Sequence, residues 1–369
     1  MPKKVLLIAT VQSHIGQFHK PLMRLLKEHG WEVHVAAGNN LAEKDHLALE
    51  YPDKVFDIPF RRSPFDPKNI LAYRMLKKLL KEERYDVIHC NTPVGGVFGR
   101  LAARKYRKQG TKVFYTAHGF HFYKGAPKKN WLLYFPIEKW LSRVTDKLIT
   151  VNAEDYTLAK ERFSCPVERI HGVGANSSKY FPLSESEQRK QKKELGLTGH
   201  VFMSVGELLP NKNQKTAILA VKALLPEMPD IRLLLAGNGP ERENLEKLIA
   251  QEGLREHVTM LGYTTKLTHY LQVCDALIAC SYREGLPMNV VEAMLCGKPV
   301  IASHNRGHDE LVQNNVNGWL TEPDNVAGFA ERLQLLLSES PLSQETICSS
   351  VEAYKAENVE KELTRIYLL

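Results

Sequence analysis

The 369-residue sequence lacks several features that would place it in a specialised class. No apolar run approaches the roughly 18 residues of a membrane-spanning helix. The six cysteines are scattered and form no Cys-x-x-Cys pair, which argues against a zinc or redox site and favours reduced core thiols. Met1–Thr10 has only a short apolar run before Gln12, so we expect a buried first strand there instead of a signal peptide. These absences predict a cytoplasmic protein.

Tandem repeats and low-complexity tracts are also absent, but positive charge is in excess, at +8 with a pI near 9.0. Basic proteins bind nucleic acids, anionic membranes or phosphorylated substrates. No zinc-finger, RNA-recognition or basic-zipper signature accompanies the charge, so we expect no nucleic-acid partner. Basic and aromatic residues instead mix between residues 67 and 140, which suits an anionic lipid surface, although solvated lysines over core aromatics give the same pattern. The residues concerned are Arg74, Lys77, Lys78, Lys81, Arg100, Arg104, Lys105, Arg107, Lys108, Lys128, Lys129, Trp131, Tyr134 and Trp140.

Short apolar runs alternate with helix-length amphipathic segments, such as 67–84 and 95–109, along most of the chain. This alternation predicts parallel sheets with helices on both faces. The expected strands are 5–10, 32–38, 55–60, 87–91, 112–118, 147–152 and 169–173, followed by 201–206, 232–237, 258–263, 276–281, 300–303 and 319–321.

A polar stretch over 177–199 separates the two series, and its run 185–195 is either a helix or a linker. We therefore predict an α/β protein of two doubly wound, Rossmann-like domains, 1–180 and 181–354, facing each other across a cleft. Residues 355–369 are a short segment that would complete the first domain if it crossed back. Ligands of such sheets bind at the carboxyl ends of the strands.

The segment 281–301 carries the most specific pattern, SYREGLPMNVVEAMLCGKPVI. Pro287 suits a first helical turn and Gly297 a helix end, so a helix is predicted over 287–296, with a phosphate-binding N-terminus. Glu284 and Glu292 flank that terminus. They are too far apart for an acid/base pair, but each suits the hydroxyls of a different sugar. A capping Glu284 and a solvated Glu292 are the commoner explanation of the bare spacing, since two glutamates eight residues apart are frequent.

Three further strand ends carry weaker signals. One strand ends at Gly206, and its loop runs through Glu207 to Lys212, a compact charge suited to a diphosphate or simply a surface lysine. A second ends at the Gly237-x-Gly turn, a pattern common in α/β folds. Tyr263 ends a third, where it either stacks beside a base or is structural.

In the first half, Gly16 follows the first strand where a helix N-terminus can approach phosphate. The segment Tyr115-Thr-Ala-His-Gly-Phe-His ends another strand and brings His118 and His121 toward the predicted cleft. A lone histidine is more often structural. Neither histidine has metal-like spacing to a partner, so no metal site is predicted.

Together these segments resemble the family 4 glycosyltransferases, which are two-domain, metal-independent, retaining enzymes of the GT-B fold. The resemblance covers nearly the whole chain. The strings RSPFDP from Arg62, NTPVGG from Asn91, YTAHGFHFYKGAP from Tyr115 and NRGH from Asn305 are similar to the branch that builds bacterial capsule and biofilm exopolysaccharides.

The resemblance implies transfer of an N-acetylhexosamine from a UDP-sugar to a polyprenyl-diphosphate-linked saccharide, without cofactor or metal, at the inner face of the cell membrane. It implies catalytic roles for Glu284, which faces the donor sugar, His118, which touches the transferred sugar, and Lys212, which holds the diphosphate. The implied donor-binding residues are Gly16, Gly206, Glu207, Gly237, Tyr263, Gly285, Leu286, Met288, Asn289, Val290 and Glu292. Among these, Glu292 holds the ribose, the residues near Tyr263 border the base, and the backbone amides of 288–291 bind phosphate.

Two departures from the family pattern concern charge and backbone. Many relatives carry arginine where Glu207 stands, although this branch commonly has glutamate, and Arg306 is a candidate compensating cation. Relatives often have two glycines near Gly16, and here there is one.

Two alternatives remain open. A nucleotide-sugar epimerase or a phosphorylase has a similar two-domain shape, although nothing singles out the pyridoxal lysine of a phosphorylase. A non-catalytic scaffold of a polysaccharide assembly complex would be indicated by loss of Glu284, Lys212 or Glu292, and all three are present.

Overall fold

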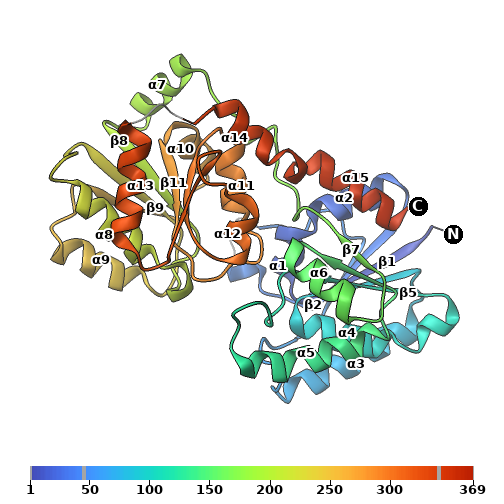
Figure 1. Ribbon diagram of the computed structural model, residues 1–369. Helices are drawn as coiled ribbons and strands as arrows, with labels where there is room; N and C mark the ends of the chain where they lie inside the picture. The colour runs from blue at the N-terminus through green and yellow to red at the C-terminus, as the bar shows by residue number, and fades with distance from the viewer. Residues whose placement is uncertain (1, 44–46, 339–341, 369) are drawn as a thin grey trace. The chain divides into compact units, whose positions relative to one another are not determined.

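The computed structural model describes residues 2–43, 47–338 and 342–368. The chain divides into two compact units, Met1–Gly174 with Ala356–Leu369 (unit 1) and Ala175–Lys355 (unit 2). This boundary falls a few residues before the predicted one at 180/181. Each unit is a parallel sheet with helices on its faces, as the alternation predicted (Figure 1). Among the described residues, no helix combines the length and apolar character needed to cross a membrane.

Unit 1 contains a seven-stranded sheet in the order β3-β2-β1-β4-β5-β6-β7, and the pairings within it are parallel. Its strands are β1 (Lys4–Val11), β2 (Glu32–Gly38), β3 (Lys54–Asp57), β4 (Val87–Asn91), β5 (Lys112–Ala117), β6 (Lys147–Thr150) and β7 (Val167–Arg169). Strand order reverses between β1 and β4, which makes this the switch point of a doubly wound sheet. β1 is apolar over most of its length because both of its faces are covered by helices.

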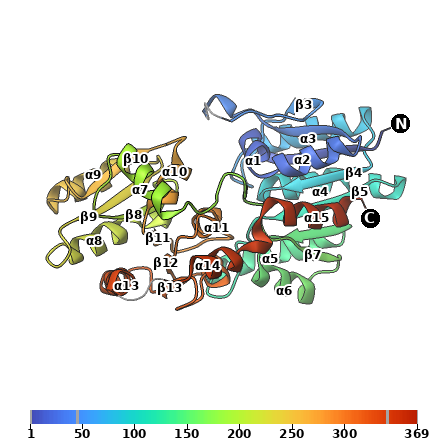
Figure 2. The same cartoon turned by 90° about the horizontal axis from the view of Figure 1, so that it is seen from above.

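The helices of unit 1 cover both faces of its sheet. α3 (Lys68–Glu82), α4 (Pro93–Ala103) and α5 (Lys128–Ser142) lie on one side, with α2 (Lys20–Glu28) and α15 (Ala356–Tyr367) on the other (Figures 1 and 2). The remaining elements are α1 (Gln12–Phe18), α6 (Ala153–Arg162) and short 3₁₀ turns at Leu41–Glu43 and Tyr106–Gln109. α4 packs so closely that a Cβ on Gly96 would lie 2.6 Å from the Tyr115 ring.

The last helix, α15, is held to the rest of unit 1 by hydrogen bonds of its side chains. Glu362 accepts hydrogen bonds from the backbone N–H and, at 2.7 Å, from the ring Nδ1 of His171, in the loop after β7. The hydroxyl of Tyr367 lies 2.5 Å from Nδ1 of His89 in the buried strand β4. Because this hydrogen bond is buried and directional, it sets the position of α15 on the sheet in addition to the apolar packing of the helix.

Unit 2 contains a six-stranded sheet in the order β10-β9-β8-β11-β12-β13, which reverses between β8 and β11. Its strands are β8 (His200–Val205), β9 (Ile231–Ala236), β10 (Val258–Gly262), β11 (Ala276–Ala279), β12 (Val300–Ser303) and β13 (Gly318–Thr321). Its helices are α7 (Glu185–Glu194), α8 (Gln214–Leu224), α9 (Arg242–Gln251), α10 (Leu267–Val273), α11 (Met288–Leu295), α12 (Arg306–Leu311), α13 (Val326–Ser338) and α14 (Gln344–Ser350), with 3₁₀ turns at Pro210–Lys212 and Glu352–Tyr354.

The expected elements differ from the observed ones mainly at their ends. Pro59 cannot donate to a ladder, and β3 ends before it, at Asp57, instead of at residue 60. β7 lies at Val167–Arg169, earlier than the predicted 169–173, because positive φ at Gly172 and Gly174 breaks the extended chain that follows. The polar run 185–195 is a helix, α7, which begins with a capping box at Ser184.

Candidate active site

The switch point of unit 2 joins two residues that lie far apart in the sequence. Lys212 follows β8 through a single 3₁₀ turn, and Glu284 follows the neighbouring strand β11. The Lys212 Nζ lies 2.6 Å from Oε1 of Glu284, and both side chains are largely shielded, with exposed fractions of 23% and 14%. The pair is a charge-assisted hydrogen bond in partial shelter from water, where it is stronger than on an open surface.

Two glycine turns stack against each other beside this pair. Gly206 directly follows β8 with φ 150°, and Gly237 directly follows β9 with φ 145°, conformations that side chains disfavour. A Cβ on Gly237 would lie 1.9 Å from the carbonyl oxygen of Gly206, so only glycine fits. A Cβ on Gly206 would meet the aliphatic stem of Lys212 at 3.4 Å. The turns therefore leave bare backbone next to the lysine.

The N-terminus of α11 lies at the same edge of the sheet. Pro287 is the N-cap residue, and the helix begins at Met288, one residue later than predicted. The side-chain amide of Asn289 donates to the carbonyl of Val205 at 2.7 Å and ties the first turn to the end of β8. The N–H of Val290 already donates to the Pro287 carbonyl at 3.1 Å. The amides of Met288 and Asn289, at the positive end of the helix dipole, are therefore better placed than that of Val290 to bind an anion.

Glu292 lies inside α11 and is partly buried. Burial raises the pKa of its carboxyl to about 7, although a hydrogen bond from Tyr180 favours the charged form. Glu292 is therefore not the solvated helix residue that its spacing alone would allow. A carboxyl held near its midpoint at neutral pH is suited to accept hydroxyl hydrogen bonds once a ligand supplies them.

Arg306 begins α12 beside the ion pair, and its Nε donates to the backbone carbonyl of Glu284 at 3.2 Å. The approach is close, since a Cβ on Gly307 would lie 2.8 Å from Cβ of Glu284. The structure thus places Arg306, the candidate compensating cation, next to Glu284. Glu207 has an exposed side chain on the loop after Gly206.

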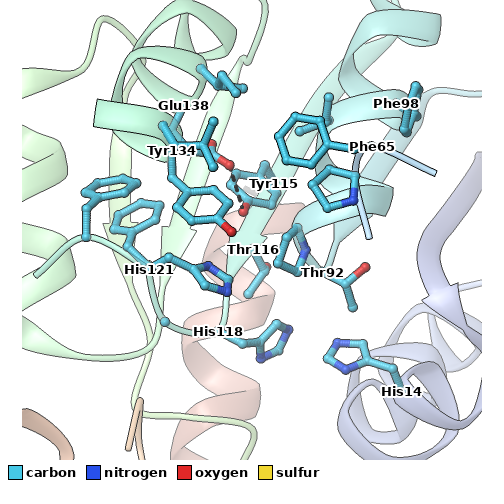
Figure 3. Close-up of a pocket in the computed structure, with 18 residues that line it drawn as sticks. His14, Phe65, Thr92, Phe98, Tyr115, Thr116, His118, His121, Tyr134 and Glu138 are labelled. Carbon is cyan, nitrogen blue, oxygen red and sulfur yellow. Dashed lines mark hydrogen bonds between the residues drawn. The ribbon is translucent and has the colours of Figure 1, made fainter. Parts of the chain in front are cut away.

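Unit 1 has a cavity of about 520 Å³ at the carboxyl ends of β4 and β5 (Figure 3). Its outer wall is apolar and comes from α4, α5 and the loop before α3, with Phe65, Phe98, Leu133, Tyr134 and Ile137 among the lining residues. A largely apolar wall with a few polar groups is typical of pockets for organic ligands.

The cavity ends on a polar network. Figure 3 shows Glu138 of α5 close to Tyr115, whose hydroxyl donates to Oε1 of Glu138 at 3.4 Å. Arg100 donates to Oε2 of Glu138 at 2.7 Å, and its guanidinium lies 3.8 Å from the centre of the Tyr115 ring. Arg100 is only 1% exposed, so its assignment to a basic surface was wrong. The glycines that precede it in the NTPVGG string let α4 approach the sheet closely, a signal that hydropathy does not carry.

Histidines surround the inner end of the same cavity. His14 of α1 and His118, which follows β5, both line it, and Figure 3 shows their rings turned toward one another. Burial lowers the pKa of His118 to about 4, so its ring is neutral at pH 7. His121 also lines the cavity, with its ring centroid 4.7 Å from that of Tyr134. Gly16 is buried on α1, where a Cβ would meet Leu47 at 3.3 Å.

Comparison with known proteins identifies the family. A model described as "Glycosyltransferase Family 4" matches residues 20–173, and one described as "Glycosyl transferases group 1" matches residues 185–350. A protein of Bacillus subtilis, "Putative glycosyltransferase EpsD", is 44% identical over 100% of this chain and 97% of its own length. This chain is a family 4 glycosyltransferase.

More distant relatives of the glycosyltransferase have more specific names. The Escherichia coli "UDP-Gal:alpha-D-GlcNAc-diphosphoundecaprenol alpha-1,3-galactosyltransferase" is 29% identical over 75% of this chain and 72% of its own. The Campylobacter jejuni "N,N'-diacetylbacillosaminyl-diphospho-undecaprenol alpha-1,3-N-acetylgalactosaminyltransferase" is 26% identical over 89% of each chain.

Solved structures confirm the GT-B fold of the glycosyltransferase. The sucrose-phosphate synthase of Thermosynechococcus elongatus matches with a TM-score of 0.80 and 20% identity, over 99% of this chain and 98% of that one. Anabaena Alr3699/HepE in complex with UDP-glucose matches with a TM-score of 0.75 and 22% identity, over 98% of each chain.

The structure separates the predicted site residues of the glycosyltransferase into two groups. Unit 1 holds Gly16 and His118, and unit 2 holds Gly206, Glu207, Lys212, Gly237, Tyr263, Glu284, Gly285, Leu286, Met288, Asn289, Val290 and Glu292. Within unit 2, Lys212 and Glu284 are in direct contact, and Tyr263 is half-exposed just after β10. Sequence reasoning missed Glu138, Tyr115 and His14, because nothing in their spacing shows that α1, β5 and α5 share a cavity.

Proposed function

We propose that this glycosyltransferase moves an N-acetylhexosamine from a UDP-sugar to a polyprenyl-diphosphate-linked saccharide in exopolysaccharide or capsule synthesis. The proposed donor site is supported by the Lys212–Glu284 ion pair beside the N-terminus of α11. The acceptor half is supported by relatives whose names specify diphosphoundecaprenol-linked saccharides.

The donor diphosphate is proposed to bind to Lys212 and to the first amides of α11. Negative charge grows on the diphosphate as the bond to the sugar breaks, and these groups stabilise that charge most in the transition state. No metal ion is needed at the diphosphate, because Lys212 and the helix supply the positive charge. When the diphosphate takes Lys212 as its partner, Glu284 is released to accept hydrogen bonds from the sugar, while Glu292 accepts those of the ribose.

Retention of configuration is proposed from the same arrangement. The nucleotide diphosphate leaves on the face from which the acceptor hydroxyl attacks, and its departing oxygen takes the acceptor proton, so no dedicated base is required. The names of the two lipid-linked-saccharide relatives specify alpha products. Transfer from an alpha-linked donor to an alpha product is retention.

The acceptor saccharide is proposed to bind in the cavity of unit 1. Tyr134 and His121 offer ring faces for a pyranose, and Glu138 offers carboxylate oxygens for its hydroxyls. We assign His118 to contact with the transferred sugar. Its neutral ring can accept or donate one hydrogen bond to a hydroxyl, whereas a charged ring could only donate.

A membrane surface is proposed as the partner of unit 1. α3 and α5, on the same side of the sheet, and the loop before α3 expose large apolar side chains, led by Leu132 at 80% and Phe65 at 72%. Lys77, Lys78, Lys128 and Lys129 lie on the same helices, and apolar anchors with basic neighbours suit anionic lipid. Replacing these four lysines with glutamate should abolish sedimentation with anionic vesicles. Unchanged sedimentation would exclude this surface.

The test of transfer is a donor screen. Purified protein is stripped of metal and kept in EDTA, a panel of nucleotide sugars is added with a polyprenyl-diphosphate saccharide, and release of nucleoside diphosphate is measured. We expect release from UDP-N-acetylhexosamine, with anomeric configuration retained in the product by NMR, and loss of release in Glu284→Ala. Release that requires added Mg²⁺ would contradict the proposed diphosphate site.

The same screen tests the scaffold alternative. A chain that neither releases nucleoside diphosphate nor shows a thermal shift with UDP is a scaffold. UDP binding that is lost in Lys212→Met would place the nucleotide at the ion pair even before the acceptor is found.

A further inference from the structure

The short turn that contains Lys212 ends in an unusual backbone conformation. This turn, Pro210–Lys212 (the lysine turn), is followed by Asn213, whose φ of 51° and ψ of 40° lie in the left-handed region. Most side chains disfavour this region, and asparagine is among the few residue types that enter it at low cost. The position of Lys212 therefore depends on a bend that the backbone does not adopt by default.

The side chain of Asn213 holds this bend from a distance. Asn213 occupies the N-cap position of α8, where asparagine ordinarily accepts a hydrogen bond from the first amides of its own helix, but among the described residues it makes no such bond. Its amide Nδ2 instead donates to the carbonyl of Pro323 at 3.0 Å and to Oδ1 of Asp324 at 3.3 Å. Both acceptors lie in the loop after β13, 110 and 111 residues away in the sequence. The lysine turn is thus tied to a distant loop instead of to the helix that follows it.

Asp324 also accepts a hydrogen bond from the loop that contains Glu284. The hydroxyl of Tyr282, two residues before Glu284, donates to the same Oδ1 atom of Asp324 at 2.6 Å. This loop is also joined directly to the lysine turn. The Nδ2 of Asn211 donates to the carbonyl of Arg283 at 2.9 Å, and the backbone N–H of Tyr282 donates to the carbonyl of Asn211 at 2.9 Å. The loops after β8, β11 and β13 therefore form one closed hydrogen-bonded network, in which Asp324 is a shared acceptor.

The network can hold the site in a state where the ion pair cannot. The Lys212–Glu284 contact joins the two loops through their side chains, but the proposed donor diphosphate takes Lys212 as its partner and releases Glu284. The hydrogen bonds of the network involve neither of these two side chains, so they persist when the ion pair opens. Groups that stabilise a developing charge are most effective when they are already fixed in place before the charge appears.

We propose that Asp324 is a positioning residue for Lys212, acting through Asn213 and Tyr282 to hold the lysine turn and the Glu284 loop in place for the donor diphosphate. This inference rests on the proposed binding of that diphosphate by Lys212. Asp324 needs no contact with the donor in this role, because its effect reaches the ligand through the backbone on which Lys212 and Glu284 lie. Asn213 is the buried end of the network, at 9% exposure, whereas Tyr282 and Asp324 are exposed. Asp324 can therefore be changed without opening the core of unit 2.

The test compares a ligand that has the diphosphate with one that lacks it. UDP binding to the full chain is measured by titration calorimetry, and uridine binding by ligand-observed NMR. Asp324→Ala removes the shared acceptor, and we expect about tenfold weaker UDP binding, the effect of losing a hydrogen bond to a charged group, with uridine affinity unchanged. Asp324→Asn keeps an oxygen that can accept both hydrogen bonds, so it should return UDP affinity to that of the unaltered chain. Equal weakening for both ligands, or no rescue by asparagine, would overturn the positioning role.

Further variants separate this inference from the proposed function. Glu322→Ala removes an exposed carboxylate from the same loop and should change neither affinity. UDP binding that is unchanged in Lys212→Met would remove the proposed diphosphate site, and the positioning role with it. UDP binding that weakens in Lys212→Met but not in Asp324→Ala would exclude the positioning role alone. If Asp324→Ala does not fold, as judged by circular dichroism, Tyr282→Phe takes its place, because it deletes only the hydroxyl that donates to Asp324.

Discussion

The two units have sheets of the same strand order around their switch points but opposite chemistry there. Between β8 and β11, unit 2 presents an ion pair, bare glycine turns and a helix N-terminus. Beside the ends of β4 and β5, unit 1 presents neutral buried histidines and an aromatic cavity. One fold thus presents charged groups in one unit and a largely apolar cavity in the other. The loops that follow the strands make the difference, not the sheets.

Acidification should produce the largest difference in stability between the two units. Burial lowers the pKa of His89 to about 3 and of His118 to about 4. The unfolded chain binds these protons near pH 6.5, so stability is lost as pH falls below that value toward the folded pKa values, by roughly 3 kcal/mol per histidine at pH 4. Hydrogen exchange measured as the pH falls should show unit 1 opening before unit 2. The variant His118→Asn should lose less stability on acidification, and equal acid sensitivity in that variant would contradict the assignment.

Removing the positive charge of Lys212 in unit 2 should have the next largest effect, and it should be seen in the rate of transfer. Lys212→Met deletes the charge that stabilises the leaving diphosphate, and we expect kcat/KM to fall by about 10²–10³-fold. The matched control is Lys215→Met, an exposed lysine on α8 whose loss should leave steady-state kinetics unchanged. Equal rates for both variants would remove Lys212 from the site.

Glu292 should respond to pH in the opposite sense from the histidines. The folded pKa is raised to about 7, so its contribution is fully present below pH 4.5 and is lost as pH rises through 7, by roughly 2–3 kcal/mol. Glu292→Gln should therefore stabilise the protein against urea at pH 8 and change little at pH 5.

The same substitution tests the ribose assignment. Titration calorimetry should show UDP affinity of the unaltered chain rising between pH 6 and 8 as Glu292 ionises, with the rise absent in Glu292→Gln. Glu345→Gln, an exposed carboxyl on α14, serves as the control for both measurements. A pH-independent affinity in the unaltered chain would argue against a charged acceptor for the ribose.

The smallest expected effect concerns vesicle binding by the exposed apolar side chains of unit 1. Leu132→Asn removes the most exposed large apolar side chain among the described residues of unit 1, and partial insertion of a leucine into lipid predicts about a tenfold loss of vesicle affinity. Val316→Asn changes an exposed apolar residue of unit 2 and should have no effect. If both variants bind vesicles equally, lipid contact is not a property of unit 1 alone.

Local sequence patterns were sufficient to predict many of the strands, turns and helix ends. The strands 32–38, 87–91 and 300–303 match the structure residue for residue, because apolar runs bounded by polar turns leave few alternatives. The turn glycines at 206 and 237 and the helix after Pro287 were recognisable for the same reason, since glycine and proline restrict backbone geometry locally. Errors gathered at element ends, where β7 and α11 are shifted by loop conformations that long-range packing sets.

Charge and hydropathy alone could not show which polar residues are buried. Arg100 looked like one of several surface cations on its helix, but close packing of α4 places it against Glu138 and Tyr115. Glu292 has the sequence context of a solvated helix residue, yet it is partly buried next to Tyr180.

The sequence by itself determined the class of fold, the two series of strands and the identity of the groups around the α11 N-terminus, because each depends on neighbours along the chain. Only the tertiary structure brought Lys212 to Glu284, α15 to His89, and His14 and His19 to His118. These contacts join segments that the sheets order in space, and parallel strand order depends on packing of the whole unit rather than on any local pattern.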